Sequence, residues 1–426
     1  MDTTVTSDNN RNNITTNPKS TNDSSISSNT DMSVGVIHYN MESYGENIIN
    51  NVPAWGEHVG LHSIKSLDEL GIKLFLCSTS FPKKEKTLER VGIDVEKSID
   101  GFVKAIGRNE ILPFLGVYQR LVYSYFFFKK LIKSFDPDFF LVTGGSAIIP
   151  QSMAERTIVY VHYPTDLEIS QKDYTSNIMK KMYIRPYLFV SNNLDYIKKA
   201  TIITNSNYTK KAIKQIWNAD STVIYPPCPQ YSFPLEEKIK EETADTTTTV
   251  CSLGRFTPEK EYDMILKIAK DRPKLKFELI GSVTADKISY LEGLKNKASK
   301  NVIFHVNASI DEKEEVLKRS KILIHSFKGE HFGVAIIEAM SAGLIPITHN
   351  SGAAKEDKLV DDMFRYDNLE KALDCLDRAF SIWNVDEALK LRQYAQNFST
   401  ENYNKNLKSF IVNWVKTHLH LLKNKE

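Results

Sequence analysis

Two series of apolar runs, each interrupted by helical stretches, constrain the fold of this chain more than any other feature. The first series is SVGVIH (33–38), IKLFLCS (72–78), DFFLVTG (138–144), TIVYVHYP (157–164), TIITNS (201–206) and STVIYPP (221–227). The second is VCSLGRF (250–256), KFELIGSV (276–283), NVIFHVN (301–307), KILIHSF (321–327) and LIPITHN (344–350). Continuous apolar strands that alternate with helices are typical of a parallel sheet covered on both faces. The sequence therefore predicts an α/β fold with two doubly wound, Rossmann-like domains.

Polar segments between and around these series predict the domain boundaries. Residues 1–31, of which 20 are Asn, Ser or Thr, cannot bury enough apolar surface to fold, and we expect a disordered tail. An N-terminal domain at 32–230, a linker at 231–249 and a C-terminal domain at 250–398 should follow. Residues 399–426 have the pattern of an amphipathic helix, which we expect to pack back on the N-terminal domain. Two such domains should face each other across a cleft at the carboxyl ends of their strands, where ligands bind.

The charge balance and the cysteines argue against several classes of protein. The chain has 426 residues, with 55 Lys and Arg against 53 Asp and Glu, so no general basic field favours a nucleic-acid partner. The four cysteines lie far apart in sequence, which favours free thiols in a reducing compartment over a zinc knuckle or a redox pair. No stretch of about 20 apolar residues occurs, and the signal-peptide pattern is missing. We therefore expect a cytoplasmic chain without a membrane-spanning helix.

The segment EHFGVAIIEAMSAG (330–343) is the most informative candidate site. It follows the run KILIHSF, so a loop that carries Glu330 should lead into a helix that carries Glu338. Gly333 lets the backbone approach a ligand closely, and the first amides of a helix point outward as free donors that attract phosphate. The two carboxylates could bind different parts of one ligand, such as sugar hydroxyls at both ends of a nucleotide sugar.

The alternative is a solvated loop acid at Glu330 and a surface helix acid at Glu338. Glu338, however, lies within VAIIEAM, an apolar stretch in which an exposed acid is unusual. We therefore expect the Glu338 carboxylate to be mostly buried and to have hydrogen-bonding or charged partners.

The segment LGRFTPEKEY (253–262) forms the first strand-to-helix turn of the second domain. Arg255 and Lys260 are five positions apart across this turn, close to Gly254, so both side chains can face the cleft. An Arg holds two phosphate oxygens at once and a Lys adds a mobile point charge, so the pair could neutralise a diphosphate without a metal. Two ordinary surface cations are the alternative.

Two histidines stand at the ends of predicted strands. His162 lies near the end of TIVYVHYP, and His38 occupies the same kind of place after the first strand. A histidine there could hydrogen-bond sugar hydroxyls, and its backbone carbonyl could stabilise developing positive charge. A structural histidine with satisfied hydrogen bonds is the alternative.

The segment Asp136-Pro137-Asp138 has the carboxylate spacing of a metal-binding DxD motif. It directly precedes a predicted strand, however, and proline fixes the backbone angle that a turn requires. We interpret the segment as a turn and predict no metal site.

Residues 102–133 are rich in aromatic and cationic side chains. Such a composition is typical of a segment that lies in a membrane interface, or of a core helix with a solvated basic end. A peripheral membrane contact and a purely structural helix are both open.

GRFTPEK (254–260) and EHFGVAIIE (330–338) together resemble the signature of the retaining glycosyltransferases of the GT-B fold, carbohydrate-active family four. The resemblance covers most of residues 33–415. Within that family the chain is similar to the GDP-mannose-dependent α-1,2-mannosyltransferases of dolichol-linked glycan assembly. This likeness rests on YVHYPTD (160–166), TNSNYTKKAIKQIW (204–217), VIYPPCP (223–229) and EHFGVAIIEAMSAGLIPITHNSGAAKEDKL (330–359).

The resemblance implies which residues are catalytic. Arg255 and Lys260 would hold the donor diphosphate, next to Gly254. Glu330 would hold the hydroxyls of the donor sugar, and His162 would lie over that sugar.

The resemblance also implies further contacts to the donor. Glu338 would bind the ribose hydroxyls. The backbone amides that follow the first glutamate would lie beside the sugar; they belong to His331, Phe332 and Gly333.

The first domain departs from the family pattern. An acceptor or phosphate loop would comprise His38, Gly56 and Glu57, but Trp55-Gly56 stands where the family usually has consecutive glycines. Ser351-Gly352-Ala353 likewise replaces a more usual double glycine.

The implied reaction transfers a hexose, mannose from GDP-mannose, to a hydroxyl of a glycan or polyprenyl-linked acceptor, with retained anomeric configuration. No resident cofactor is expected, since the nucleotide sugar is a substrate. The alternatives are a glycosyltransferase that uses a UDP-sugar, a nucleotide-sugar epimerase of the same architecture, and a non-catalytic nucleotide-sugar sensor.

Overall fold

The computed structural model describes residues 32–38, 41, 55–105, 116–144, 149–164, 178, 182, 185, 195–236, 238 and 249–423. The predicted tail, 1–31, lies outside these residues, and so do most residues of the predicted linker. Contacts divide the chain into two compact units. The first comprises 1–159, 183–201 and 413–426, and the second comprises 160–182 and 202–412.

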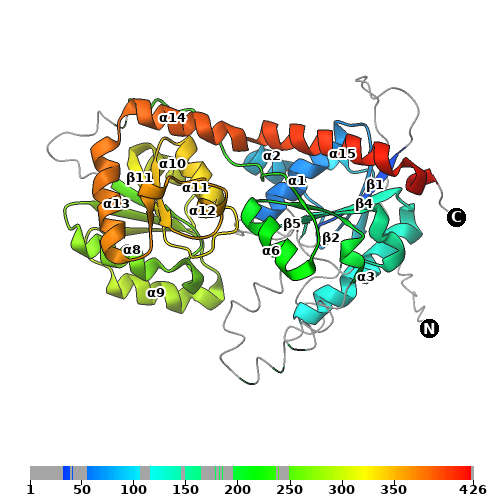
Figure 1. The fold of residues 1–426 in the computed structure, drawn as a ribbon, viewed down its shortest axis with the longest axis horizontal. Helices are drawn as coiled ribbons and strands as arrows, with labels where there is room; N and C mark the ends of the chain where they lie inside the picture. Colours follow the sequence, from blue (N-terminus) through cyan, green and yellow to red (C-terminus); the bar gives the residue numbers. More distant parts are fainter. Residues whose placement is uncertain are drawn as a thin grey trace, which may run out of the picture. The chain divides into compact units, whose positions relative to one another are not determined.

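A parallel sheet of seven strands forms in the N-terminal half of the chain (Figure 1). Its strands are β1 (Ser33–Ile37), β2 (Lys73–Ser78), β3 (Gly101–Lys104), β4 (Phe139–Val142), β5 (Thr157–Val161), β6 (Thr201–Thr204) and β7 (Thr222–Val223). The strand order is β3-β2-β1-β4-β5-β6-β7. All residues of β1 are buried, as expected of a central strand covered on both faces, and the register places Val36 beside Leu76 and Leu141.

The helices of this half follow the sequence signals for helix starts and ends. They are α1 (Trp55–Asp68), α2 (Lys84–Val91), α3 (Gly116–Phe135) and α6 (Asn207–Trp217). α1 packs against β2, and α3 packs against β2 and β3. Ser206 caps α6, because its hydroxyl accepts from the Thr209 amide at 3.0 Å. Gly92 ends α2 in a left-handed conformation.

A second parallel sheet, of six strands, forms in the C-terminal half. Its strands are β8 (Thr249–Leu253), β9 (Lys276–Gly281), β10 (Val302–Val306), β11 (Ser320–His325), β12 (Ile345–His349) and β13 (Arg365–Tyr366). The strand order is β10-β9-β8-β11-β12-β13. Every apolar run of the two predicted series overlaps one strand of the corresponding sheet, so the prediction of two parallel-sheet, Rossmann-like domains is confirmed.

Helices accompany the second sheet as the alternating pattern predicts. They are α8 (Tyr262–Asp271), α9 (Ile288–Lys297), α10 (Ile310–Arg319), α11 (Val334–Ser341), α12 (Ala353–Glu356), α13 (Leu369–Ile382) and α14 (Val385–Ala395). Three of them begin after a residue whose side chain accepts from a backbone amide of the first turn: Ser309, Asn368 and Asn384.

The helix predicted after residue 398 is α15 (Thr400–Lys423). Its C-terminal part belongs to the first unit. There the Trp414 ring lies 5.4 Å from the Phe139 ring of β4, and its indole N–H donates to Thr201 Oγ1 at 2.7 Å. This aromatic side chain therefore fixes the last turns of α15 against the N-terminal sheet.

The segment Asp136-Pro137-Asp138 is a turn, as predicted. The Asp136 amide donates to carbonyls at the end of α3, and Asp138 Oδ2 accepts from both the amide and the hydroxyl of Ser33, each at 2.7 Å. Within the described ranges, no three His, Cys, Asp or Glu side chains cluster in a way that could hold a metal ion. No helix in the described part of the chain is both long and apolar enough to cross a bilayer.

Candidate functional site

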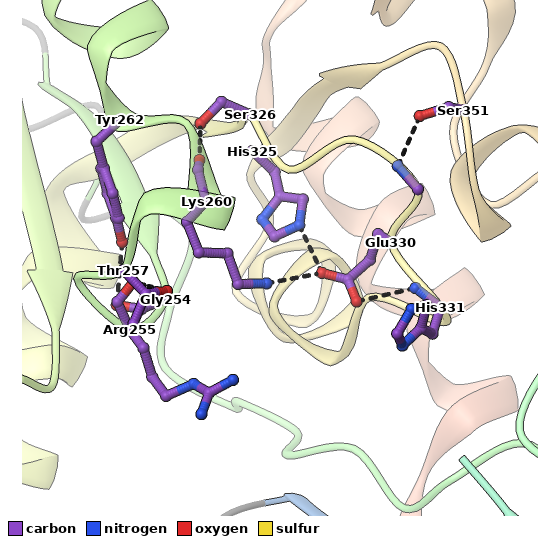
Figure 2. Close-up of polar contacts among 11 residues, drawn as sticks. Gly254, Arg255, Thr257, Lys260, Tyr262, His325, Ser326, Glu330, His331 and Ser351 are labelled. Carbon is purple, nitrogen blue, oxygen red and sulfur yellow. Dashed lines mark hydrogen bonds and ion pairs between the residues drawn. The ribbon is translucent and has the colours of Figure 1, made fainter. Parts of the chain in front are cut away.

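The candidate site lies at the carboxyl edge of the second sheet, where β8 and β11 are neighbours. Gly254 and Arg255 follow β8 directly, and the loop 326–333 follows β11 and leads into α11. Neighbouring parallel strands end at the same edge of a sheet, so the two segments meet there. Figure 2 shows the side chains of Lys260 and His325 converging on Glu330.

Three donors hold the Glu330 carboxylate (Figure 2). Lys260 Nζ lies 3.1 Å and His325 Nε2 lies 2.8 Å from Oε2. The backbone amide of His331 donates to Oε1 at 3.1 Å. The Lys260 and Glu330 side chains are 18% and 16% exposed, and that of His325 is 4% exposed. Glu330 is therefore not the solvated loop acid of the alternative interpretation.

Burial and charge together set the protonation states of this cluster. Burial opposes ionisation of Glu330, but the Lys260 ammonium and the His325 hydrogen bond outweigh it, so the pKa of Glu330 stays well below its ordinary value. Burial lowers the pKa of His325, although Glu330 acts in the opposite direction. At neutral pH Glu330 is therefore an ionised carboxylate, and His325 is a neutral imidazole whose Nε2–H donates to Oε2.

Short-range contacts fix the backbone around Lys260. The single turn Pro258–Lys260 ends at Glu261, whose φ of +50° is left-handed. Ser326 Oγ donates to the Lys260 carbonyl at 2.6 Å, and Lys260 Nζ lies 4.1 Å from the centre of the Phe327 ring. The ammonium is thus held against the loop that follows β11.

Arg255 has a different environment from Lys260. Its side chain is exposed, and no hydrogen bond or ion pair with another described residue involves its guanidinium, which lies apart from the Lys260–Glu330 pair in Figure 2. Gly254 shapes the turn through its carbonyl, which accepts from Tyr262 Oη at 3.0 Å. The predicted diphosphate pair therefore consists of one exposed cation and one cation already paired with a carboxylate.

A second loop supports the backbone of Glu330. Gly352 has φ +66° and ψ −156°, and a side chain at this position would overlap the Glu330 backbone. The Ala353 amide donates to the Glu330 carbonyl at 2.8 Å, and Ser351 Oγ accepts from the Gly329 amide at 2.8 Å. Where the sequence departs from a double glycine, one glycine permits the close approach and Ser351 supplies a hydroxyl.

The start of α11 presents free backbone donors. Gly333 has φ +97°, and its carbonyl accepts from the amides of Ile336 and Ile337. Among the described residues, no hydrogen-bond acceptor faces the amides of Phe332 and Gly333. The Phe332 side chain, by contrast, is 2% exposed and packs near the Tyr225 ring. The backbone of this segment is thus available to an anionic ligand while the ring anchors it.

Glu338 lies inside α11 and is 3% exposed. Its Oε1 accepts from Tyr231 Oη at 2.8 Å and from Lys313 Nζ at 2.5 Å. Burial and the neighbouring Glu338 carboxylate raise the pKa of Tyr231, so the phenol keeps its proton and donates it. The prediction of a buried carboxylate with partners is confirmed, and its contact with ribose stays a prediction.

His162 follows β5 and lies close to the Glu330 loop. Its carbonyl accepts from Thr209 Oγ1 at 3.3 Å, and the same hydroxyl lies 3.5 Å from the His331 carbonyl. The adjacent Tyr163 stacks on the His331 ring, with the ring centres 3.7 Å apart. The end of β5 and the loop after β11 therefore meet through one hydroxyl and one ring pair.

The residues predicted for a loop of the first domain have other surroundings. Gly56 and Glu57 lie in the first turn of α1 rather than in a loop, and the Glu57 side chain is 2% exposed. His38 is also buried, its Nδ1 lies 2.9 Å from Thr143 Oγ1, and a side chain at Gly60 would collide with its ring. For His38 the structural alternative therefore fits the packing, since the glycine of α1 lets the helix close over it.

The sequence prediction missed several residues that build this site. His325 contacts Glu330 directly, while Ser326 and Phe327 contact Lys260. Gly352, identified from the sequence only as part of a departure from a double glycine, packs against the Glu330 backbone. His325 ends a predicted strand, so the argument applied to His38 and His162 could have identified it. The contacts of Gly352 join loops that are distant in sequence and have no comparable local signal.

Residues 235–357 match the model of the family described as Glycosyl transferases group 1. The match includes β8, β11, α11 and every residue of the Lys260–His325–Glu330 cluster. This part of the chain is therefore similar to the glycosyl transferases group 1 family, in agreement with the resemblance of its two motifs.

Curated relatives carry one recurrent name. The chain is 28% identical to the "GDP-Man:Man(3)GlcNAc(2)-PP-Dol alpha-1,2-mannosyltransferase" of Xenopus laevis, over 56% of each chain. It is 28% identical to the protein of that name from Yarrowia lipolytica, over 54% of this chain and 41% of the relative, and 27% identical to the human protein, over 47% of each. The chain thus spans about half the length of the curated relatives it matches.

Solved structures share the fold over nearly the whole chain. A glycosyltransferase from Rickettsia africae has a TM-score of 0.61 at 16% identity, over 93% of this chain and all of that one. Sucrose-phosphate synthase from Thermosynechococcus elongatus has a TM-score of 0.65 at 11% identity, over 91% of this chain and all of that one. These likenesses show the fold, and the prediction of a GT-B architecture is confirmed.

Proposed function

We propose that this chain is a retaining glycosyltransferase that moves mannose from GDP-mannose to a hydroxyl of a glycan or lipid-linked glycan acceptor. The observation that carries the proposal is the Lys260–His325–Glu330 cluster before α11, within the region that matches the glycosyl transferases group 1 family. The name shared by the curated relatives supports the choice of donor and acceptor.

The cluster has the groups that transfer from a nucleotide sugar requires. The transition state gains negative charge on the leaving diphosphate and positive charge on the sugar ring. Lys260, the exposed Arg255 and the amides before α11 can stabilise the diphosphate, while the Glu330 carboxylate can accept hydrogen bonds from sugar hydroxyls. The roles of Glu338 at the ribose and His162 over the sugar belong to the same proposal. Because the chain's own cations supply the counter-charge, we propose no resident cofactor.

The acceptor side of the proposal includes a peripheral membrane contact. One face of α3 carries Phe126, which is 52% exposed, and the exposed Lys129, Lys130 and Lys133. These positions are spaced as one helical face, and a basic face with an exposed ring suits an anionic lipid surface. All four cysteines are buried free thiols, which fits a reducing compartment. We therefore propose that the chain acts at the cytoplasmic face of a membrane.

A donor panel followed by product analysis tests the proposal. Purified protein is heated with GDP-mannose, UDP-glucose or ADP-glucose, with and without a chelator; a donor at 100 times its Kd adds about 2.7 kcal/mol of stability. Transfer to a mannose-terminated lipid-linked acceptor is then followed by mass spectrometry. Glu330→Gln, which keeps the shape but loses the charge, should lower kcat/KM about 10²- to 10³-fold.

Glu259→Gln is the matched control, because Glu259 lies in the same turn as Lys260 and makes no contact with the cluster. This variant should transfer at the wild-type rate. Stabilisation by UDP-glucose alone would overturn the donor assignment. Formation of an epimerised sugar nucleotide without acceptor would show an epimerase instead of a transferase. Donor binding without turnover would indicate a non-catalytic sensor.

A further inference from the structure

The start of α6 contacts the Glu330 loop although it contributes nothing to the cluster itself. This segment, Ser206–Thr209, lies within the block TNSNYTKKAIKQIW. Ser206 Oγ donates to the His331 carbonyl at 2.5 Å. The Tyr208 hydroxyl lies 3.4 Å from the point where a side chain would begin at Gly329. The first turn of α6 therefore supports the loop that carries Glu330.

The carboxylate of Asp357 holds this turn in place from a distance of 150 positions in the sequence. Its Oδ1 accepts from the Asn207 amide at 2.6 Å, and its Oδ2 accepts from the Tyr208 amide at 3.0 Å. The Asn207 side-chain amide, at 3.0 Å, and Tyr225 Oη, at 3.2 Å, also donate to Oδ1. A carboxylate that accepts from the first amides of a helix is favoured by both hydrogen bonding and the helix dipole.

Asp357 also directly follows α12, the second support of the loop. At the start of α12 the Ala353 amide donates to the Glu330 carbonyl, and Gly352, directly before it, packs against the Glu330 backbone. One carboxylate thus joins the helix that holds the His331 carbonyl to the helix that holds the Glu330 carbonyl. Without it, two half-buried amides of α6 lose their acceptor. The link between α6 and α12 then depends on the largely exposed Lys211–Glu356 ion pair, and exposed pairs contribute little.

We propose that Asp357 is a positioning residue that keeps the Glu330 carboxylate in the geometry required for sugar transfer. The inference deepens the proposed function and rests on it. Asp357 touches neither Lys260, His325 nor the Glu330 side chain and acts only through the backbone of the loop. Because a displacement of about 1 Å lowers a rate about 10²-fold, loosening this loop is expected to reduce catalysis without removing any group of the cluster.

A double-mutant cycle between Asp357 and Glu330 tests the proposal. Asp357→Ala removes all four hydrogen bonds, and Asp357→Asn keeps the volume and one acceptor oxygen in case the alanine variant does not fold. In the wild-type background either change should lower kcat/KM about 10- to 100-fold. In the Glu330→Gln background the same change should lower it less than about twofold, because residues that act through one group are not additive.

Asp361→Asn is the matched control. Asp361 lies four positions further along, and its carboxylate caps a different backbone amide, that of Met363 at 2.9 Å. This variant should keep the wild-type kcat/KM. An equal loss for the Asp357 variants in both Glu330 backgrounds, or no loss in either, would overturn the proposal.

Hydrogen exchange of the peptide 327–333 separates this inference from the proposed function. In Asp357→Asn the amides of this peptide should exchange at least about tenfold faster than in the wild type, whereas Asp361→Asn should leave them unchanged. If the wild type transfers no sugar, the proposed function fails and the exchange result still decides whether Asp357 positions the loop. Unchanged exchange in Asp357→Asn contradicts the positioning role.

Discussion

Replacing Gly352 by alanine tests whether the backbone of Glu330 is held by the loop before α12. At φ +66° and ψ −156° only glycine is comfortable, and a side chain there costs about 1–3 kcal/mol in backbone strain. The new Cβ would also overlap the Glu330 backbone, which adds about 1–3 kcal/mol through displaced atoms. We expect Gly352→Ala to destabilise its unit by about 2–6 kcal/mol and to lower kcat/KM about 10²-fold through the shifted carboxylate.

Differential scanning calorimetry and steady-state transfer kinetics measure the two effects, and Gly92→Ala is the control. Gly92 has the same φ of +66°, but apart from its chain neighbours no described residue comes within 4 Å of a Cβ built on it. Gly92→Ala should therefore lose only the about 1–2 kcal/mol of stability that a left-handed alanine costs, and it should transfer sugar at the wild-type rate. If Gly352→Ala and Gly92→Ala have the same stability loss and the same rate, the close approach at Glu330 has no energetic consequence and the argument is refuted.

Two further predictions concern histidines. His325→Phe should lower kcat/KM about tenfold by removing the Nε2–H donor to Glu330. His325→Gln, whose side-chain amide can donate to Glu330, should retain more of the wild-type kcat/KM. Equal losses in both variants would contradict a role for His325 as a hydrogen-bond donor. Burial lowers the pKa of His62 to about 3 in the folded protein. As the pH falls, the unfolded chain therefore protonates His62 before the folded chain does. The stability that neutral His62 contributes is present above pH 6.5 and is lost as the pH falls toward 3. Urea unfolding should show a loss of about 2 kcal/mol between pH 7 and pH 5 that is absent in His62→Phe; parallel pH profiles would exclude it.

The sequence predicted most of the fold because the central strands are buried on both faces. β1 and β11 read as continuous apolar runs for this reason, and their burial is complete. β3 and β13 were missed because they contain only four and two residues and include charged side chains. Strands this short have no periodic pattern in the sequence, so they can be recognised only from their pairing with the rest of the sheet.

The candidate site was predictable only in part. Placing Lys260 and Glu330 at one sheet edge follows from parallel topology, but their mutual pairing does not, because the sequence argument grouped Lys260 with Arg255. His38 also ends a strand, but the structure buries its ring beside Gly60 of α1, a contact between two elements that the strand-end position does not indicate. Asp357 meets α6 across 150 residues, and such a contact depends on tertiary packing rather than on a local pattern.

Before any ligand arrives, Glu330 Oε2 already receives an ammonium and an imidazole N–H. A ligand hydroxyl that donates to Glu330 Oε2 competes with Lys260 for this oxygen. A diphosphate that draws the Lys260 ammonium toward itself would leave a lone pair of Oε2 free to accept from the hydroxyl. For the proposed substrate, the two halves of a nucleotide sugar then strengthen each other's binding, which is cooperativity within a single molecule. If the proposed function holds, a free hexose or a bare nucleoside diphosphate binds less tightly than the intact nucleotide sugar, because neither fragment makes both contacts.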